Sequence, residues 1–170
     1  PLNEFFESDG RELPSARELP PEKLPDPQRA LLCHDRDMTP TLESHHGGKI
    51  HVDAQAVVES KGTHAREVLL RLDESDRAVE CGAIKIHLDD LAGPAKQLIL
   101  DNKEPLGRIL NEHGIAFESR PILYFRIMPN EDIRRILDAA PGKALYGRRN
   151  VLAHPDGNII AEIVEILPEA

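Results

Sequence analysis

Apolar and polar residues alternate along three consecutive stretches in the first half of the chain. These stretches are KIHVDAQAVVES (Lys49–Ser60), AREVLLRL (Ala65–Leu72) and AVECGAIKIHL (Ala78–Leu88). Alternation with a period of two is typical of strands with one buried face, and β-branched residues are frequent in all three. The segments between them, KGT and DESD, have the composition of turns. The pattern therefore predicts a three-stranded antiparallel meander.

The second half of the chain predicts three more strands. One covers Phe117–Met128, and the other two form a hairpin within Ala144–Pro168, turned by Pro155-Asp156-Gly157. Helical periodicity and capping residues predict five helices, at Gln28–His34, Thr39–His46, Asp89–Asp101, Pro105–Gly114 and Asn130–Ala139. Because helices and strands are segregated along the chain, we expect an α+β fold: a single six-stranded antiparallel sheet with helices packed on one face.

The N-terminal stretch differs from the rest of the chain. It contains five prolines between Pro14 and Pro27 and shows little periodicity. We therefore expect residues 1–25 to be a proline-rich leader on the surface, and residues 26–170 to form one domain.

Composition and charge narrow the function classes. Apolar residues make up 40% of the chain and charged residues 30%, which is ordinary for a globular protein. The formal net charge of −9 is spread along the chain, which argues against binding to nucleic acids or to anionic membranes. Cys33 and Cys81 form no CxxC pair, and no apolar run approaches the length of a membrane span. These features favour a cytoplasmic protein.

Motifs for metals and phosphate groups are lacking in the sequence. The chain has eight histidines, but HExxH and His-x-His spacings do not occur, and the adjacent pair His45 and His46 would diverge on a helix. Glycines never form GxGxxG or GxxxxGK. We therefore expect no metal site and no phosphate-binding loop.

Charged residues within the apolar strands are the main candidates for a site. Arg66 shares a strand face with Val68 and Leu70, because side chains two residues apart point the same way. On the last strand Glu162 and Glu165 point to opposite faces unless a bulge intervenes, so at most one of them can face a buried site. The alternative is that these charges form salt bridges at the rim, which contribute little to stability.

Six segments of the sequence, taken in order, resemble the chorismate lyase family and its fold relatives. They are DRDMTPTLE, HAREVLL, GAIKIHLDDLAGP, KEPLGRIL, LYGRRNVL and IIAEIVEILP, and the resemblance covers about residues 26–168. The resemblance implies a monomeric lyase that cleaves chorismate to 4-hydroxybenzoate and pyruvate without a cofactor. It also implies an antiparallel sheet whose ligand is enclosed beneath two helical flaps.

The resemblance also implies the site residues. Met38 in DMT and Leu106 in PLGR would contact the ligand from the two flaps. Arg66 in REVLL would clamp the ring carboxylate, for which a planar guanidinium is suited. Glu162 in IIAE would meet the ring hydroxyl and act with Arg66 in catalysis; the match favours Glu162 over Glu165.

Two questions stay open at this stage. Arg148 or Arg149 could hold the enolpyruvyl carboxylate, although one of this adjacent pair must point away. The same fold also serves as a non-catalytic domain that binds small aromatic carboxylates in transcription regulators, and a divergent member could act on another aromatic acid or thioester. Residues 1–25 are too short and too rich in proline for the winged helix-turn-helix of such regulators, which favours the enzyme.

Overall fold

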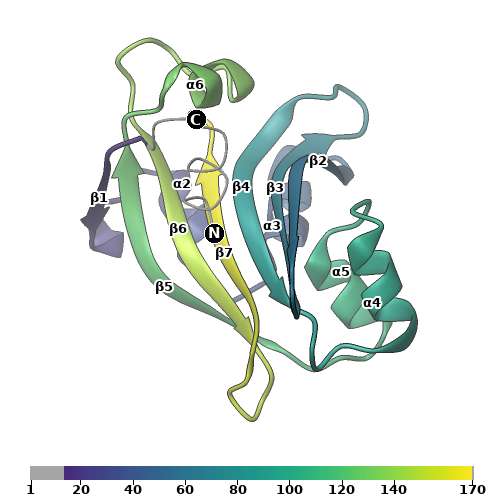
Figure 1. Cartoon of the computed structure of the whole chain (residues 1–170). Helices are drawn as coiled ribbons and strands as arrows, with labels where there is room; N and C mark the ends of the chain where they lie inside the picture. The colour runs from purple at the N-terminus through teal and green to yellow at the C-terminus, as the bar shows by residue number, and fades with distance from the viewer. Residues whose placement is uncertain (1–13, 170) are drawn as a thin grey trace.

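The computed structural model describes residues 14–169, which form one antiparallel sheet of seven strands with short helices around it (Figure 1). The strand order across the sheet is β1-β5-β6-β7-β4-β3-β2. The strands are β1 (Ala16–Leu19), β2 (Ile50–Ser60), β3 (Thr63–Leu72), β4 (Ala78–His87), β5 (Glu118–Ile127), β6 (Leu145–Ala153) and β7 (Ile159–Leu167). The helices are η1 (Pro21–Lys23), α2 (Gln28–Leu32), α3 (Met38–His46), α4 (Gly93–Leu100), α5 (Leu106–Glu112) and α6 (Glu131–Ile136).

The predicted meander and hairpin are confirmed. β2, β3 and β4 pair in sequence order, and β5, β6 and β7 do the same. β4 then pairs with β7 and joins the two halves into one sheet, with Gly82 opposite Glu165. The two strands that meet there are central, so both of their faces can be buried.

The α+β class is confirmed, but the sheet has seven strands and not the expected six. The additional strand, β1, lies in the proline-rich stretch expected to be a leader. It pairs with β5 in a register that places Ala16 opposite Ile127 and Leu19 opposite Tyr124. Residues 1–13 of the expected leader lie outside the described residues.

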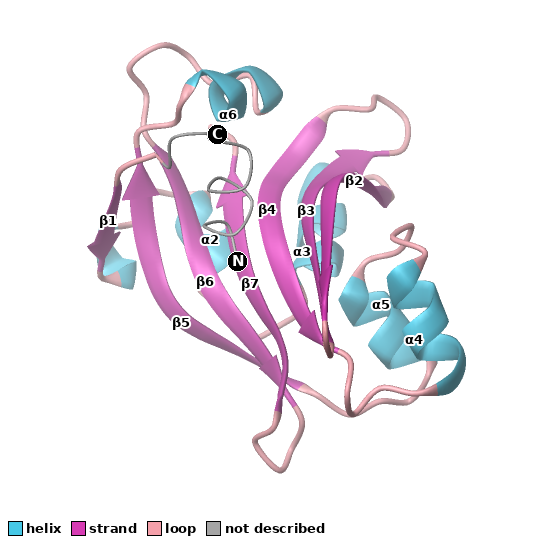
Figure 2. Ribbon diagram, in the orientation of Figure 1, coloured by secondary structure: helices cyan, strands magenta, loops and turns pink. Residues whose placement is uncertain are grey.

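Helices cover both faces of the sheet, which corrects the expectation of helices on one face. Adjacent residues of β3 show the division: Leu70 packs in a cluster with α2 and α3, whereas Leu69 packs in another with Ile133 of α6. Because neighbouring side chains on a strand point to opposite faces, α6 lies on the other side of the sheet from α2 and α3. Figure 2 shows α6 apart from α4 and α5, which lie beside the β2–β4 half. We call the face that carries Arg66 and Leu70 the cavity face, and the other the α6 face.

Local sequence signals explain where α3, which packs on the cavity face, begins and ends. α3 begins after Asp37 and has Pro40 in its first turn, a position where the missing N–H is not needed. It ends at Gly47, whose φ of +69° lies in the left-handed region that glycine adopts readily. No helix among residues 14–169 is both long enough and apolar enough to cross a membrane.

Candidate functional site

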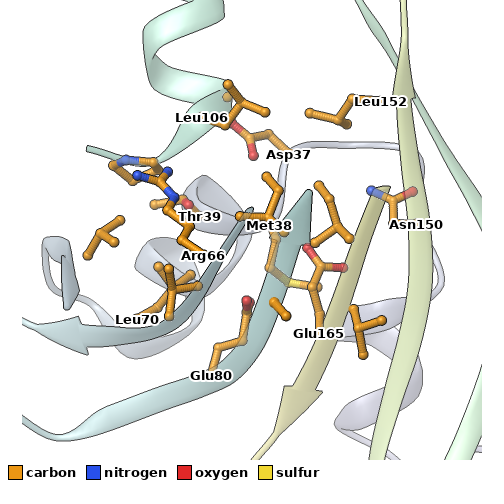
Figure 3. Close-up of a pocket in the computed structure, with 18 of the residues that line it drawn as sticks. Asp37, Met38, Thr39, Arg66, Leu70, Glu80, Leu106, Asn150, Leu152 and Glu165 are labelled. Carbon is orange, nitrogen blue, oxygen red and sulfur yellow. The ribbon is translucent and has the colours of Figure 1, made fainter. Parts of the chain in front are cut away.

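A cavity of about 70 Å³ lies between the cavity face of the sheet and the first residues of two helices (Figure 3). Residues of β2, β3, β4, β5, β6 and β7 form its floor. Asp37–Thr39 at the start of α3 and Pro105–Gly107 at the start of α5 close it from above. The polar residues of its lining are Asp37, Thr39, Arg66, Glu80, Ser119, Asn150 and Glu165. The other side chains of the lining are aliphatic, so the polar groups face each other across an apolar enclosure.

Arg66 is a buried cation with unused hydrogen-bond donors. The residue is only 2% exposed, and its Nη2 donates to the backbone carbonyl of Glu104 at 2.9 Å. Its Nε and Nη1 have no partner within the described part of the chain. Burial lowers the pKa of Arg66 to about 10, so the group is still charged at neutral pH. A buried guanidinium without a carboxylate partner is unfavourable, and an anion in the cavity would compensate it.

Three carboxyl groups line the same cavity. Glu80 is 4% exposed, and its Oε2 lacks a hydrogen-bond partner in residues 14–169. Burial, and next the charge of Glu165, raise the pKa of Glu80 well above its ordinary value. Burial and the charge of Glu165 also raise the pKa of Asp37. Protonation of one or more of these groups thus relieves their mutual repulsion.

One arginine beneath the cavity compensates part of this negative charge. Arg148 is fully buried, and its Nε donates to Oε2 of Glu165. Its Nη1 donates to the backbone carbonyls of Leu32 and His34, at 3.0 and 2.8 Å. Arg148 therefore ties β6 and β7 to the segment that leads into α3, and it orients the Glu165 carboxylate.

Two neutral polar residues of the lining bind each other. Nδ2 of Asn150 on β6 donates to Oγ of Ser119 on β5 at 3.0 Å, and both residues are buried. Within residues 14–169, no group of three or more His, Cys, Asp or Glu side chains is placed to hold a metal ion. The polar side chains of the cavity supply hydrogen bonds, charge and groups that can exchange a proton.

The structure corrects the expectation that Glu162, and not Glu165, shares a pocket with Arg66. Glu165 lines the cavity, whereas Glu162 lies on the α6 face, where its Oε1 accepts a hydrogen bond from Nη2 of Arg149 at 3.1 Å. The reason is the register of β7, which pairs with β6 without a shift from Ala161 to Leu167. With no bulge between them, residues three apart point to opposite faces.

The structure brings together three of the six predicted site residues. Met38, Arg66 and Leu106 all line the cavity, and Met38 and Leu106 lie at its two helical covers. Arg148 is buried next to Glu165 but does not line the cavity, and Arg149 is partly exposed on the α6 face. The expectation that Arg148 and Arg149 point to opposite faces of the sheet is confirmed.

Sequence reasoning missed Glu80, Asp37 and Asn150. A signal for Glu80 was present, because this glutamate stands between Val79 and Cys81 in the apolar first part of its strand, four residues from Ile84 on the same face. Asp37 directly precedes a helix, where an aspartate is ordinarily explained as a cap, and Asn150 becomes notable only when the register places it opposite Ile163.

Comparison with known proteins identifies a shared fold. No family model and no curated protein sequence matches the chain. The structure of PhnF from Mycobacterium smegmatis is similar with a TM-score of 0.61 and 14% identity, over 80% of this chain and 65% of that one. The effector domain of PhnF matches with a TM-score of 0.58 and 14% identity, over 78% of this chain and 88% of that one. A third structure is the ligand-binding domain of a protein assigned to the GntR family of transcriptional regulators, from Bordetella bronchiseptica. It matches with a TM-score of 0.49 and 10% identity, over 69% of this chain and 85% of that one.

None of these three is named as a chorismate lyase. At 14% identity a likeness shows the fold and not the activity. The chain spans 65% of the PhnF structure and most of its effector domain. The chain therefore shares the fold of the PhnF effector domain.

Proposed function

We propose that the chain is a non-catalytic effector-binding domain that takes a small organic acid in the cavity on Arg66. The observation that carries this proposal is the pair of unpartnered donors, Nε and Nη1, on a guanidinium that is 2% exposed and lines the cavity. Both groups keep N–H donors free on a planar guanidinium, and carboxylates and phosphates are the acceptors that suit such donors. The likeness to an effector domain supports a binding role over a catalytic one.

The dimensions of the cavity support a small ligand and a moving cover. Typical ligand pockets measure about 300–1,000 Å³, whereas this cavity is about 70 Å³. Entry of an aromatic acid therefore requires the starts of α3 and α5 to separate. Such a movement is also how an effector domain can report that its site is filled.

Cleavage of chorismate to 4-hydroxybenzoate and pyruvate is the second candidate. The observation that favours it is Glu80, a buried carboxyl with a raised pKa on the same cavity as Arg66. A carboxyl group with a raised pKa can act as a general acid or base. The acid/base residue would then be Glu80 and not Glu162, which points to the other face.

Calorimetric titration tests the binding proposal. Benzoate, 4-hydroxybenzoate, acetate and phosphate would be titrated into the wild-type chain, an Arg66→Met variant and an Arg149→Met variant. We expect at least one of these anions to bind the wild type and Arg149→Met alike, and to lose at least tenfold in affinity in Arg66→Met. Equal affinity in all three proteins would overturn the proposal.

Incubation with chorismate separates the two candidates. For an effector domain, pyruvate forms no faster than in protein-free buffer. Pyruvate release that Glu80→Gln abolishes and Glu162→Gln leaves intact would establish the lyase instead.

A further inference from the structure

The charges around the cavity do not balance locally. Asp37, Glu80 and Glu165 supply three carboxyl groups, and Arg148 is hydrogen bonded to only one of them, Glu165. Arg66 does not compensate the other two, because its only bond within the described residues is to the carbonyl of Glu104. The cavity therefore combines an unpaired cation with an excess of carboxyl groups.

These two features lie at different ends of the cavity. Arg66 is opposite Ile84 on β4, whereas Glu80 is four residues away along the same strand, opposite Leu70. At about 3.3 Å per residue, their Cα atoms are about 13 Å apart along the strand. Figure 3 shows the Arg66 guanidinium to one side of the group and the carboxyl groups of Glu80 and Glu165 to the other.

The Glu80 side chain lies over a glycine of its own strand. Gly82 is the strand partner of Glu165, and Oε1 of Glu80 lies 3.4 Å from where a Cβ of Gly82 would be. The Glu80 side chain thus lies along β4 toward Glu165. Its second oxygen, Oε2, is buried and has no protein partner in the described chain.

We propose that the cavity selects a zwitterion, whose anionic group binds Arg66 and whose ammonium group binds the carboxyl cluster of Asp37, Glu80 and Glu165. This inference rests on the proposed function and names the class of its ligand: an amino acid-like molecule with separated charges. An ammonium group has three donors and no acceptor, so it can satisfy Glu80 Oε2 and offset the charge that Arg148 leaves uncompensated. A ligand with only an anionic group would leave Glu80 Oε2 without a hydrogen bond and the charge of the carboxyl groups without compensation.

Matched pairs of acids test this inference. Each pair consists of an ω-amino carboxylate with two to six carbons and the acid in which a methyl group replaces the ammonium group, such as 4-aminobutanoate and pentanoate. A rigid pair, 4-(aminomethyl)benzoate and 4-ethylbenzoate, extends the series to aromatic acids. Affinities would be measured by calorimetry at pH 7 with the wild-type chain, Glu80→Gln, and Glu162→Gln as the control. Glu162 is a matched control because it lies on β7 but on the α6 face.

We expect at least one ammonium-bearing acid to bind the wild type ten or more times as tightly as its methyl partner. In Glu80→Gln the two acids of a pair should bind with nearly equal affinity, because the acid with the methyl group keeps its affinity and the acid with the ammonium group loses its advantage. In Glu162→Gln the ratio of the two affinities should be the same as in the wild type. Circular dichroism and a thermal melt of each variant establish that the fold is intact.

Two failures can be distinguished. If methyl acids bind through Arg66 as tightly as their ammonium partners in every pair, the zwitterion is excluded and anion binding stands. If no acid of either kind binds more weakly to Arg66→Met than to wild type, anion binding on Arg66 is itself excluded, and the zwitterion with it.

Discussion

The carboxylate of Asp37 lies directly against the backbone of Gly107, so that a Cβ at position 107 would overlap both of its oxygens. Asp37 immediately precedes α3, and Gly107 is the second residue of α5. The segments that cover the cavity are therefore in contact directly above it, and an ion pair between Arg108 of α5 and Glu43 of α3 also joins the two helices. That contact requires glycine because of the close approach and not because of its backbone angles.

Gly107→Ala tests this contact. Alanine favours helices, but its Cβ would displace the Asp37 carboxylate and separate the two helices. We expect a net loss of about 1–3 kcal/mol in the free energy of unfolding, the usual cost of inserting a methyl group into a packed site. Urea denaturation measures it. Gly48→Ala is the control, because its Cβ would meet Leu72 Cδ2 at an ordinary 3.5 Å; equal stability of the two variants would contradict the contact.

Arg148 and Arg149 allow a second test, since they are adjacent on β6 and point to opposite faces. Arg148→Met would leave the Glu165 carboxylate and two backbone carbonyls buried without their donor. Breaking a buried pair in this way costs about 3–5 kcal/mol. Arg149→Met removes only a partly exposed bond to Glu162 and should cost about 0–1 kcal/mol. Urea denaturation of the two variants at pH 7 gives both values, and similar losses would show that Arg148 is not a buried anchor.

The raised pKa of Glu80 predicts a stability that falls with rising pH. Since the folded state binds this proton more tightly than the unfolded state, Glu80 favours the fold fully at low pH. That contribution is lost as the pH rises from the ordinary value of 4.5 through the higher pKa of the folded state. The raised pKa of Asp37 likewise makes the stability fall as the pH rises.

Glu80→Gln checks this pH dependence. The variant should be more stable than wild type at pH 8, and its urea midpoint should fall less between pH 5 and pH 8. Glu165 on β7 and Arg148 on β6 face Glu80 in both proteins, so their own titration cancels in the comparison to first order. A parallel pH profile in the two proteins would contradict a raised pKa for Glu80.

Arg66→Met should stabilise the ligand-free protein. The substitution removes a buried charge that has a single carbonyl partner and replaces it with an apolar chain of similar length. We therefore expect a higher urea midpoint than wild type in buffer free of organic acids, together with the loss of anion binding. A lower midpoint would indicate that Arg66 supports the fold and not a ligand.

Period-two alternation and turn residues were sufficient to predict six of the seven strands. β1 was missed because a four-residue strand in a proline-rich stretch shows no pattern of its own and depends on pairing with β5. The face covered by α6 was missed for a different reason. Helical periodicity identifies an apolar stripe, but the connection and the packing decide which side of the sheet that stripe meets.

The site was predicted in part because Arg66 shares a face with Val68 and Leu70, which can be read directly from its strand. The choice between Glu162 and Glu165 needed information from other strands. β7 is central, with apolar residues on both faces, so alternation alone does not tell which glutamate is buried among polar partners. Glu165 is identified as the glutamate with buried polar partners only by its pairing with Arg148, which lies opposite it on β6.

The short strand β1 also bears on how this sheet avoids self-association. An uncovered β5 would present unpaired backbone groups from Tyr124 to Ile127, which is a template for a strand of another molecule. β1 occupies that row, is itself only four residues long, and is followed by Pro20 and Pro21. At the opposite edge, β2 is interrupted by a register shift between Ala54 and Ala56. Each edge of the sheet is thus either too short or too irregular to propagate, and the N-terminal strand acts as built-in protection against aggregation.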